Sequence, residues 1–283
     1  MIKGLIVDID GVIVGSKAGF NFPEPHPDVL ARLKGINDSG VTVSLCTAKP
    51  YFAVDGIVKG AGLSGLQITS GGGVIVNATD SSTVKSHLLD RDVVRQIVQV
   101  CLENDCYVEI FSELEYFAQL SQKSDTTVMH TKIYQRDPIF VDSLLAEVDK
   151  QDIVKVMPIA RDDQAMDAIN KYFSHFSDQA SIGWVSQPAA LPWRLCVITA
   201  KGISKAQGSH EVAEYYGIST DELLGIGDST ADWQFIEACG YAGATGNASD
   251  ELKRLVKTRG DNSFIGGDVD DNGVLEIFDY FEL

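Results

Sequence analysis

Leu5-Ile-Val-Asp8-Ile-Asp10-Gly-Val-Ile13, near the amino terminus, decides the fold of this chain. A short apolar run closed by glycine predicts a strand that is buried on both faces, as in parallel sheets. Asp8 and Asp10 lie two positions apart, so their side chains start on the same face of the strand. In open α/β sheets, ligands bind at the carboxyl ends of strands. Two neighbouring carboxylates there need a compensating cation or hydrogen-bond donor, and magnesium fits that need. The alternative is an acidic turn that only caps the next segment.

Two further predicted strands of the same sheet also end in polar residues. Thr47 ends the second strand, and Asp228 ends a later one. Because the carboxyl ends of parallel strands meet at one edge of a sheet, Asp8, Asp10 and Asp228 are expected to form a cluster there. Magnesium prefers a few carboxylates together with water and substrate phosphate. The pattern therefore predicts an oxygen-rich cation site.

Asp232 and Lys205 each have a structural and a functional interpretation. The spacing Ser229-x-x-Asp232 resembles a capping box at a helix start, which is compatible with support of a metal site. Ser204 is typical of an N-cap and places Lys205 in the first helical turn, where a cation is unfavourable. A nearby anion reverses that effect. The alternative is that Lys205 is an ordinary solvated lysine. A phosphate beside carboxylates, however, needs such a cation.

Composition narrows the class of protein. The 283 residues carry a formal net charge of -17, and the pI is near 4.6. This charge argues against non-specific binding of nucleic acid or of an anionic membrane surface. The hydrophobic content of 45% and charged content of 22% are typical of a globular protein, and no apolar stretch has the length of a membrane span. Five scattered cysteines without a CxxC pair indicate free thiols, and we expect a cytoplasmic protein.

The order of elements indicates one domain interrupted by another. Helix and strand alternate in the first part of the chain, including a strand over 66–68 that we expect in the parallel sheet. An α+β pattern follows, with a helix expected over 140–148, and the alternation resumes at Ser204. We predict a doubly wound α/β domain formed by residues 1–82 and 199–283, with an inserted α+β domain over 83–198.

Taken in order, these motifs resemble a known family. Asp8-x-Asp10-Gly, the strand-terminal Thr47, Ser-Lys205 and Gly-Asp228-x-x-x-Asp232 are similar to the four motifs of the haloacid dehalogenase (HAD) superfamily of phosphohydrolases. The large insertion between the second and third motifs resembles the Cof-like branch, which has a type IIB cap. The resemblance implies a mainly parallel, Rossmann-like core and an α+β cap that selects the substrate.

The resemblance also implies a role for each motif residue. Asp8 would be the nucleophile that forms an aspartyl-phosphate, and Asp10 the acid and base that protonates the leaving oxygen and then activates water. Thr47 and Lys205 would hold the phosphoryl group. The magnesium ligands would be the side chains of Asp8 and Asp228 and the backbone carbonyl of Asp10, with Asp232 supporting the site.

The expected activity is a magnesium-dependent phosphatase for a small phosphorylated metabolite, either a sugar phosphate or a phosphorylated acid. Two rivals stay open, and departures from the family pattern motivate the second. Ala48-Lys49 follows Thr47 where Gly-Arg is common, and Ala231 stands where Asn is usual. One rival is a phosphomutase of the same superfamily, and the other is a binding or regulatory protein without turnover.

Overall fold

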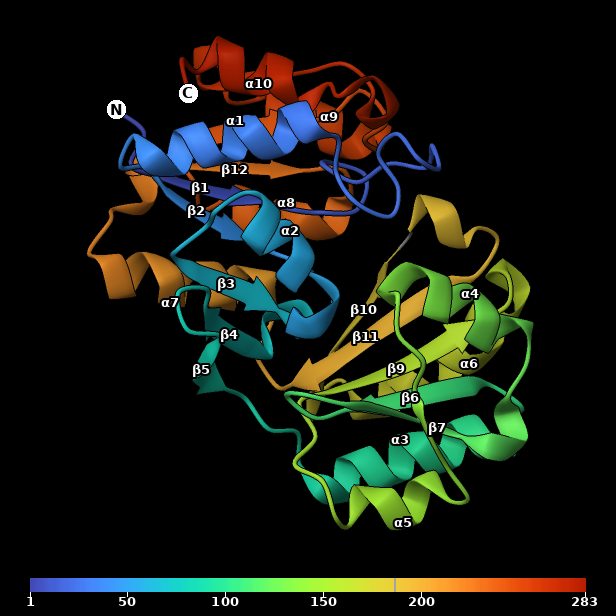
Figure 1. The fold of residues 1–283 in the computed structure, drawn as a ribbon. Helices are drawn as coiled ribbons and strands as arrows, with labels where there is room; N and C mark the ends of the chain where they lie inside the picture. The colour runs from blue at the N-terminus through green and yellow to red at the C-terminus, as the bar shows by residue number, and fades with distance from the viewer. Residues whose placement is uncertain (186) are drawn as a thin grey trace.

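The computed structural model describes residues 1–185 and 187–283 and places a parallel five-stranded sheet at the centre of one lobe (Figure 1). The strand order is β14-β13-β12-β1-β2, and every neighbouring pair is parallel. This confirms the expected doubly wound α/β class. The strands are β1 (Gly4–Val7), β2 (Thr42–Leu45), β12 (Leu223–Gly227), β13 (Tyr241–Ala244) and β14 (Ser263–Ile265).

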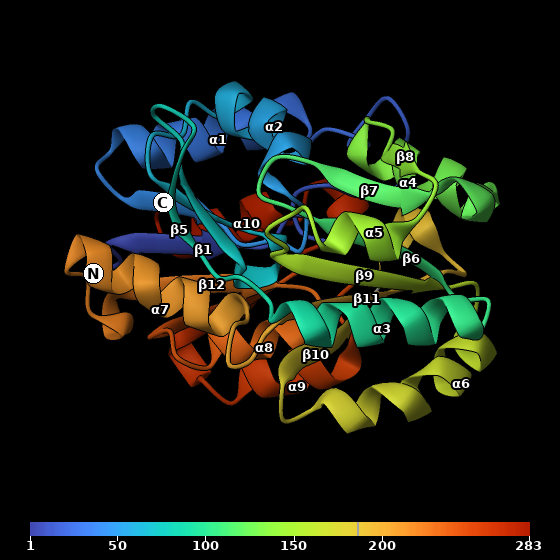
Figure 2. The ribbon, with the colours of Figure 1, turned by 90° about the horizontal axis from the view of Figure 1, so that it is seen from below.

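Helices cover both faces of this sheet, which explains the apolar sequence of β1. Leu5 and Val7 pack with α1 and α10, whereas Ile6 packs on the opposite face with α7, α8 and α9. Figure 2 shows the two helical layers on either side of β1 and β12. The helices are α1 (Pro27–Asp38), α7 (Lys205–Tyr216), α8 (Thr230–Ile236), α9 (Asp250–Lys257) and α10 (Val274–Tyr280).

The strand expected over 66–68 is present, but its place in the parallel sheet was wrong. After the short helix α2 (Asp55–Gly60), β3 (Leu66–Thr69) pairs antiparallel with β4 (Val74–Asn77), which pairs antiparallel with β5 (Ser82–Ser86). A single parallel bridge from Cys46 to Ile68 links this small sheet to the end of β2. The chain reverses direction after β3 because two consecutive glycines have positive φ, 71° and 94°, so β4 returns beside β3.

The cap is built on a six-stranded sheet of order β10-β11-β9-β6-β7-β8. Helices α3, α5 and α6 pack on one face of it, and α4 packs on the other. The strands are β6 (Tyr107–Phe111), β7 (Tyr116–Gln119), β8 (Ile139–Val141), β9 (Lys155–Ala160), β10 (Ala180–Val185) and β11 (Arg194–Ala200), and the helices are α3 (Arg91–Glu103), α4 (Asp125–Tyr134), α5 (Leu144–Val148) and α6 (Asp163–Phe173).

The single helix expected over 140–148 was also wrong. The segment is divided into β8 and α5, because the side chain of Ser143 accepts a hydrogen bond from the backbone of Ala146 and starts a new helix there. The inserted α+β architecture itself is as expected.

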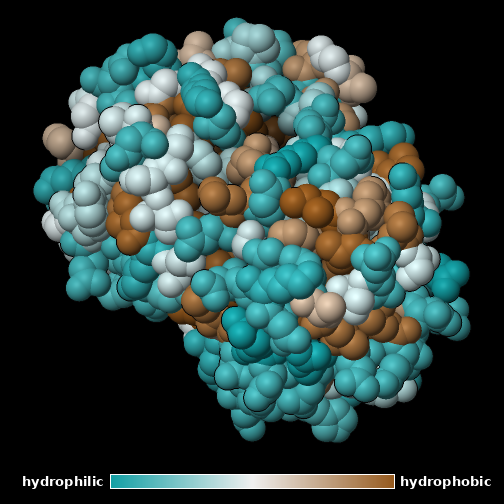
Figure 3. Space-filling view, turned by 60° about the horizontal axis from the view of Figure 1, so that its bottom comes forward, coloured by the Kyte–Doolittle hydropathy of each residue, from teal (hydrophilic) through white to brown (hydrophobic). Residues whose placement is uncertain are grey.

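The cap face that carries α4 turns toward the core. Phe111, Tyr116 and Tyr134 of the cap belong to one hydrophobic cluster with Val74 and Val76 of the core. The division into core residues 1–82 and 199–283 and cap residues 83–198 stays a prediction. In the structure, β5 pairs with β4 of the core as far as residue 86. On the face drawn in Figure 3, hydrophilic residues predominate around smaller hydrophobic groups. Among the described residues, none of the helices combines the length and the apolar character needed to cross a membrane.

Candidate active site

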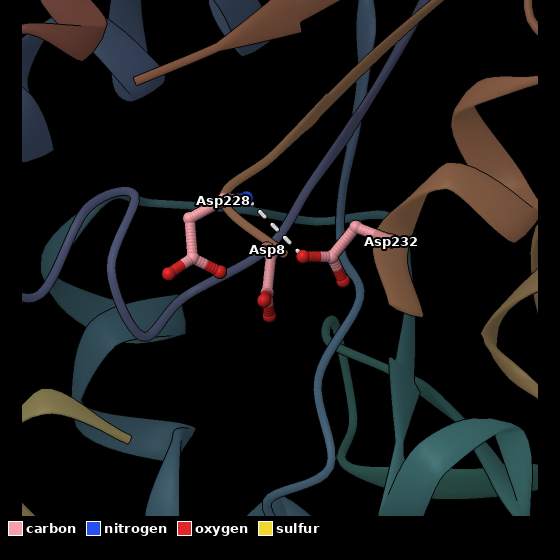
Figure 4. Close-up of side chains that lie close together, drawn as sticks. All are labelled: Asp8, Asp228 and Asp232. Atoms are coloured by element: carbon pink, nitrogen blue, oxygen red, sulfur yellow. Dashed lines mark hydrogen bonds between the residues drawn. The ribbon is translucent and has the colours of Figure 1, made fainter. Parts of the chain in front are cut away.

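The parallel sheet brings three predicted site residues together. Asp8 follows β1, and Asp228 follows the adjacent strand β12, whose Ile226 is paired with Val7. Asp232 reaches the same point from the first turn of α8. Each of the three aspartates offers a carboxylate oxygen, and these oxygens lie within 4.8 Å of one another. Figure 4 shows the carboxylates of Asp8 and Asp228 pointing the same way, with that of Asp232 beside them.

Two glycines permit this close approach. Gly11 has a φ of +81°, and a Cβ there would lie 2.1 Å from Oδ2 of Asp228. A Cβ at Gly227 would lie 2.4 Å from Cβ of Asp232. Both distances are far below van der Waals contact, so the turn after β1 and the end of β12 need glycine at these positions.

Lys205 is the cation of this cluster. Ser204 caps α7 as expected, because its side chain accepts a hydrogen bond from the backbone of Gln207. The Lys205 ammonium then lies 2.9 Å from Oδ2 of Asp8 and 2.7 Å from Oδ1 of Asp232. The anions that would favour a lysine in this first turn are therefore the carboxylates themselves.

Asp232 performs the capping role and the supporting role together. Its Oδ2 accepts hydrogen bonds from the backbone of Asp228 and from the backbone and hydroxyl of Ser229, while its Oδ1 pairs with Lys205. Burial by itself raises the pKa of Asp232, but Lys205 and the Ser229 donors outweigh burial and hold the pKa below its usual range. Both carboxylate oxygens are occupied, so this residue positions its neighbours.

The positive charge around Asp8 and Asp228 is too small to hold both carboxylates fully ionised. Burial raises the pKa of Asp8 to about 7, against the opposing effect of Lys205. Burial also raises the pKa of Asp228 well above its usual range, with further contributions from Asp232 and Asp8. These hard oxygen donors suit a divalent cation, which would favour their ionised forms. The residues therefore fit a magnesium ion.

The side chain of Asp10 lies apart from the three clustered carboxylates. Its Oδ1 accepts hydrogen bonds from the Lys49 ammonium at 2.8 Å and from the Gln187 amide at 3.2 Å. Lys49 and Gln187 were not among the residues predicted from the sequence. The sequence offered a clue to Lys49, because this residue follows the predicted site residue Thr47 by two positions. It offered no clue to Gln187.

Core and cap together enclose the cavity beside Asp8. Thr47 is buried there, and its hydroxyl accepts a hydrogen bond from the backbone of Lys49. The cavity has a volume of about 50 Å³. Its lining residues include Asp8, Asp10, Thr47, Lys49, Lys205 and Asp228 from the core and Tyr134, Met157, Val185, Gln187 and Leu195 from the cap. A larger hollow of about 1080 Å³ in the cap contains none of the six predicted site residues.

The family model of the haloacid dehalogenase-like hydrolases matches residues 5–278. The chain belongs to this family. The match spans both lobes and all four motifs, so the membership predicted from the motifs is confirmed, and with it the class of phosphoric monoester hydrolases.

Similar proteins agree with this assignment to the haloacid dehalogenase-like hydrolases. The 5-amino-6-(5-phospho-D-ribitylamino)uracil phosphatase YitU of Bacillus subtilis is 24% identical over 258 residues, which cover 89% of each chain. A phosphoglycolate phosphatase of Methanospirillum hungatei is 23% identical over 90% of this chain and 88% of its own. A haloacid dehalogenase-like hydrolase from Bacteroides thetaiotaomicron has the same fold, with a TM-score of 0.83 at 18% identity over 99% of this chain and 100% of its own. The subclass IIB sugar phosphatase BT4131 has a TM-score of 0.80 at 16% identity, covering 99% of each chain.

In this member of the family, a buried lysine of the cap contacts the loop that carries Thr47. Lys155 is 0% exposed, and its ammonium donates a hydrogen bond to the backbone carbonyl of Ala48 at 2.9 Å. It also lies 3.3 Å from the hydroxyl of Tyr134 and 3.7 Å from the centre of the Phe111 ring. Burial lowers the pKa of Lys155 to about 7, although Glu109 acts in the opposite direction.

Lys155 is expected to make stability depend on pH. Its pKa is about 7 in the folded protein and about 10.4 in an unfolded chain, so between these values the unfolded chain binds the extra proton. The contribution of Lys155 therefore increases stability as pH rises, with a slope of up to about 1.4 kcal/mol per pH unit. Urea unfolding of wild type and Lys155→Met between pH 7.5 and 9.5 measures this contribution as a difference that grows with pH. Lys171→Met, at an exposed position of α6, serves as the control, and parallel profiles for wild type and Lys155→Met would contradict the assignment.

Proposed function

We propose that this protein is a magnesium-dependent phosphatase that hydrolyses a small phosphorylated metabolite through an aspartyl-phosphate at Asp8. The observation that supports this most directly is the buried carboxylate of Asp8, which faces the Lys205 ammonium and the neighbouring Asp228. Carboxylates act as nucleophiles in covalent phosphoryl transfer, and the enclosed site keeps bulk water away from the reaction.

The first step is attack of the Asp8 carboxylate on phosphorus. The bond from phosphorus to the ester oxygen breaks, and Asp10 gives its proton to that leaving oxygen. In the second step, Asp10 takes a proton from the water that attacks the aspartyl-phosphate, which releases phosphate and restores Asp8. Lys205 and Thr47 hold the equatorial oxygens of the phosphoryl group during both steps. A magnesium ion held by Asp8, Asp228 and the backbone carbonyl of Asp10 would supply positive charge beside these oxygens.

The geometry of Asp10 indicates which oxygen carries the transferred proton. Both Lys49 and Gln187 donate hydrogen bonds to Oδ1. An oxygen that already accepts two donors is a poor site for a further proton. We therefore assign the transferred proton to Oδ2.

The size of the cavity supports a small substrate and a moving cap. A space of about 50 Å³ accommodates a phosphoryl group and little else. The alcohol part of the substrate enters when the cap moves away from the core, as lids do in other enzymes. The related phosphatases from B. subtilis and M. hungatei act on a phosphorylated ribityl compound and on phosphoglycolate, which supports a sugar phosphate or a phosphorylated acid. A cytoplasmic location is part of the proposal, and five buried free cysteines are compatible with it.

A screen of phosphorylated metabolites with and without magnesium tests the proposal. We expect magnesium-dependent release of inorganic phosphate from at least one small ester. Formation of an isomeric sugar phosphate without phosphate release would instead identify a phosphomutase. Binding without either reaction would contradict the proposed turnover.

Asp228→Asn is expected to weaken metal dependence. The amide removes one charged ligand while keeping its shape, so the magnesium concentration for half-maximal activity should rise at least about tenfold. Magnesium titrations of phosphate release and calorimetric binding measure this change. Asp232→Asn provides the contrast, because loss of its pairing with Lys205 should lower the unfolding temperature more than it alters the titration. An unchanged titration for Asp228→Asn would remove Asp228 from the metal site.

A further inference from the structure

Gln187 is the point at which the cap contacts the acid of the reaction. It lies two residues beyond β10, and its side chain is buried in the wall of the active-site cavity. Its Nε2 donates to Oδ1 of Asp10 at 3.2 Å. Among the described residues of the cap, no other side chain donates a hydrogen bond to one of the six predicted site residues.

The other end of the same amide is unsatisfied. Gln187 is only 5% exposed, and its Oε1 is buried without a hydrogen-bond partner among the described residues. A buried acceptor without a donor costs about 1–3 kcal/mol. Such a group in a cavity that must receive a ligand indicates that the ligand supplies the donor.

The orientation of the amide is fixed by its neighbours. Exchange of its oxygen and nitrogen would place two acceptors, Oε1 and Oδ1 of Asp10, 3.2 Å apart. A proton on Oδ1 would relieve that repulsion, but the Lys49 ammonium already donates to this oxygen. Nε2 therefore faces Asp10, and Oε1 is the atom left without a donor in this residue of the cavity wall.

The missing donor has a restricted chemistry. Phosphate oxygens and an ionised carboxylate only accept hydrogen bonds near neutral pH, so neither satisfies Oε1. A hydroxyl group does. Nε2 of the same amide is hydrogen-bonded to Asp10, which protonates the leaving oxygen. The hydroxyl that reaches Oε1 must therefore lie close to the ester, on a neighbouring carbon of the alcohol.

We propose that Gln187 is a specificity-determining residue whose Oε1 accepts a hydrogen bond from a hydroxyl next to the phosphate ester. The inference rests on the proposed phosphatase function and deepens it. Of the two substrate classes considered, it selects a polyol or sugar phosphate over a phosphorylated acid without such a hydroxyl. A site built to bind a hydroxyl discriminates strongly against analogues that lack it.

The test compares glycerol 1-phosphate with n-propyl phosphate and 2-phosphoglycolate. The first ester has a neighbouring hydroxyl, the second lacks it, and the third carries a carboxylate instead. We expect kcat/KM of the wild type to be at least about tenfold higher for glycerol 1-phosphate than for the other two. Equal values would overturn the assignment, and this comparison requires no variant.

Gln187→Met separates specificity from a structural role. Methionine has a similar length but neither the Nε2 donor to Asp10 nor a strong acceptor, so kcat/KM should fall for both esters and at least about tenfold further for glycerol 1-phosphate. The preference should therefore shrink at least about tenfold. Gln164→Met, at an exposed position of α6, should keep the wild-type preference. An equal fall for both esters would overturn the inference and leave the phosphatase intact. Absence of phosphate release from every ester of the metabolite screen would overturn the proposed function, and the inference with it.

Discussion

Asp8→Asn is expected to abolish turnover. The amide is not a nucleophile, so no aspartyl-phosphate forms and the phosphate-release rate should fall at least about a thousandfold. The fold should be retained, because asparagine has the same shape and removes a buried carboxylate whose pKa burial raises to about 7. Phosphate release at saturating magnesium measures the rate, and thermal unfolding measures the fold.

A matched substitution shows whether the effect belongs to position 8. Asp167→Asn makes the same chemical change at an exposed position of α6 and should leave the rate unchanged. Turnover by Asp8→Asn within about tenfold of wild type would assign the nucleophile to another group.

Lys205→Met is expected to cause the largest loss of stability. The ammonium is the partner of both Asp8 and Asp232, at 2.9 and 2.7 Å. Its removal leaves buried carboxylates without a cation, which typically costs about 3–5 kcal/mol. The free energy of unfolding in urea, measured in the presence of a chelator, should fall by that amount.

Magnesium should restore part of the stability lost in Lys205→Met. A cation that binds only the folded protein stabilises it by mass action, and the variant has more uncompensated negative charge at the site. Lys257→Met, at an exposed position of α9, should match the wild type in both conditions. A free energy of unfolding that Lys205→Met leaves unchanged would show that Asp8 and Asp232 do not depend on this ion pair.

The parts of the site that depend on one strand and its register could be predicted from the sequence. Asp8 and Asp228 follow apolar strands, and parallel neighbours place such ends together whatever the details of the loops. The direction of the Asp10 side chain could not be predicted, because Gly11 turns the chain with a φ of +81°. The partners of Asp10 and of the 47–49 loop come from segments that only tertiary packing brings close. Lys155 and Gln187 are of this kind.

Errors in the fold prediction have a similar origin. The sequence analysis did not predict β7 or α4. Half of the ten residues of α4 are β-branched, and such residues are unfavourable in an isolated helix. The conformation of α4 is therefore decided by its packing against the cap sheet and the aromatic side chains of the same hydrophobic cluster. The strand over 66–68 was recognised from its composition, but the direction of its partners depended on how the chain reverses at the following glycines.

The burial of Lys155 against the backbone of Ala48 links cap motion to proton exchange with solvent. When the cap lifts, the amine returns to water, regains the basicity of an ordinary lysine and takes up a proton near neutral pH. Closure expels that proton, since the amine then faces Phe111, Tyr134 and, at longer range, Glu109 in a dry environment. Lowering the pH from about 10 toward 7 therefore shifts the population toward the open form, whereas below about 7 both forms hold the proton and no further shift follows. As the pH falls across that range, products should escape faster, while substrates should be captured less tightly.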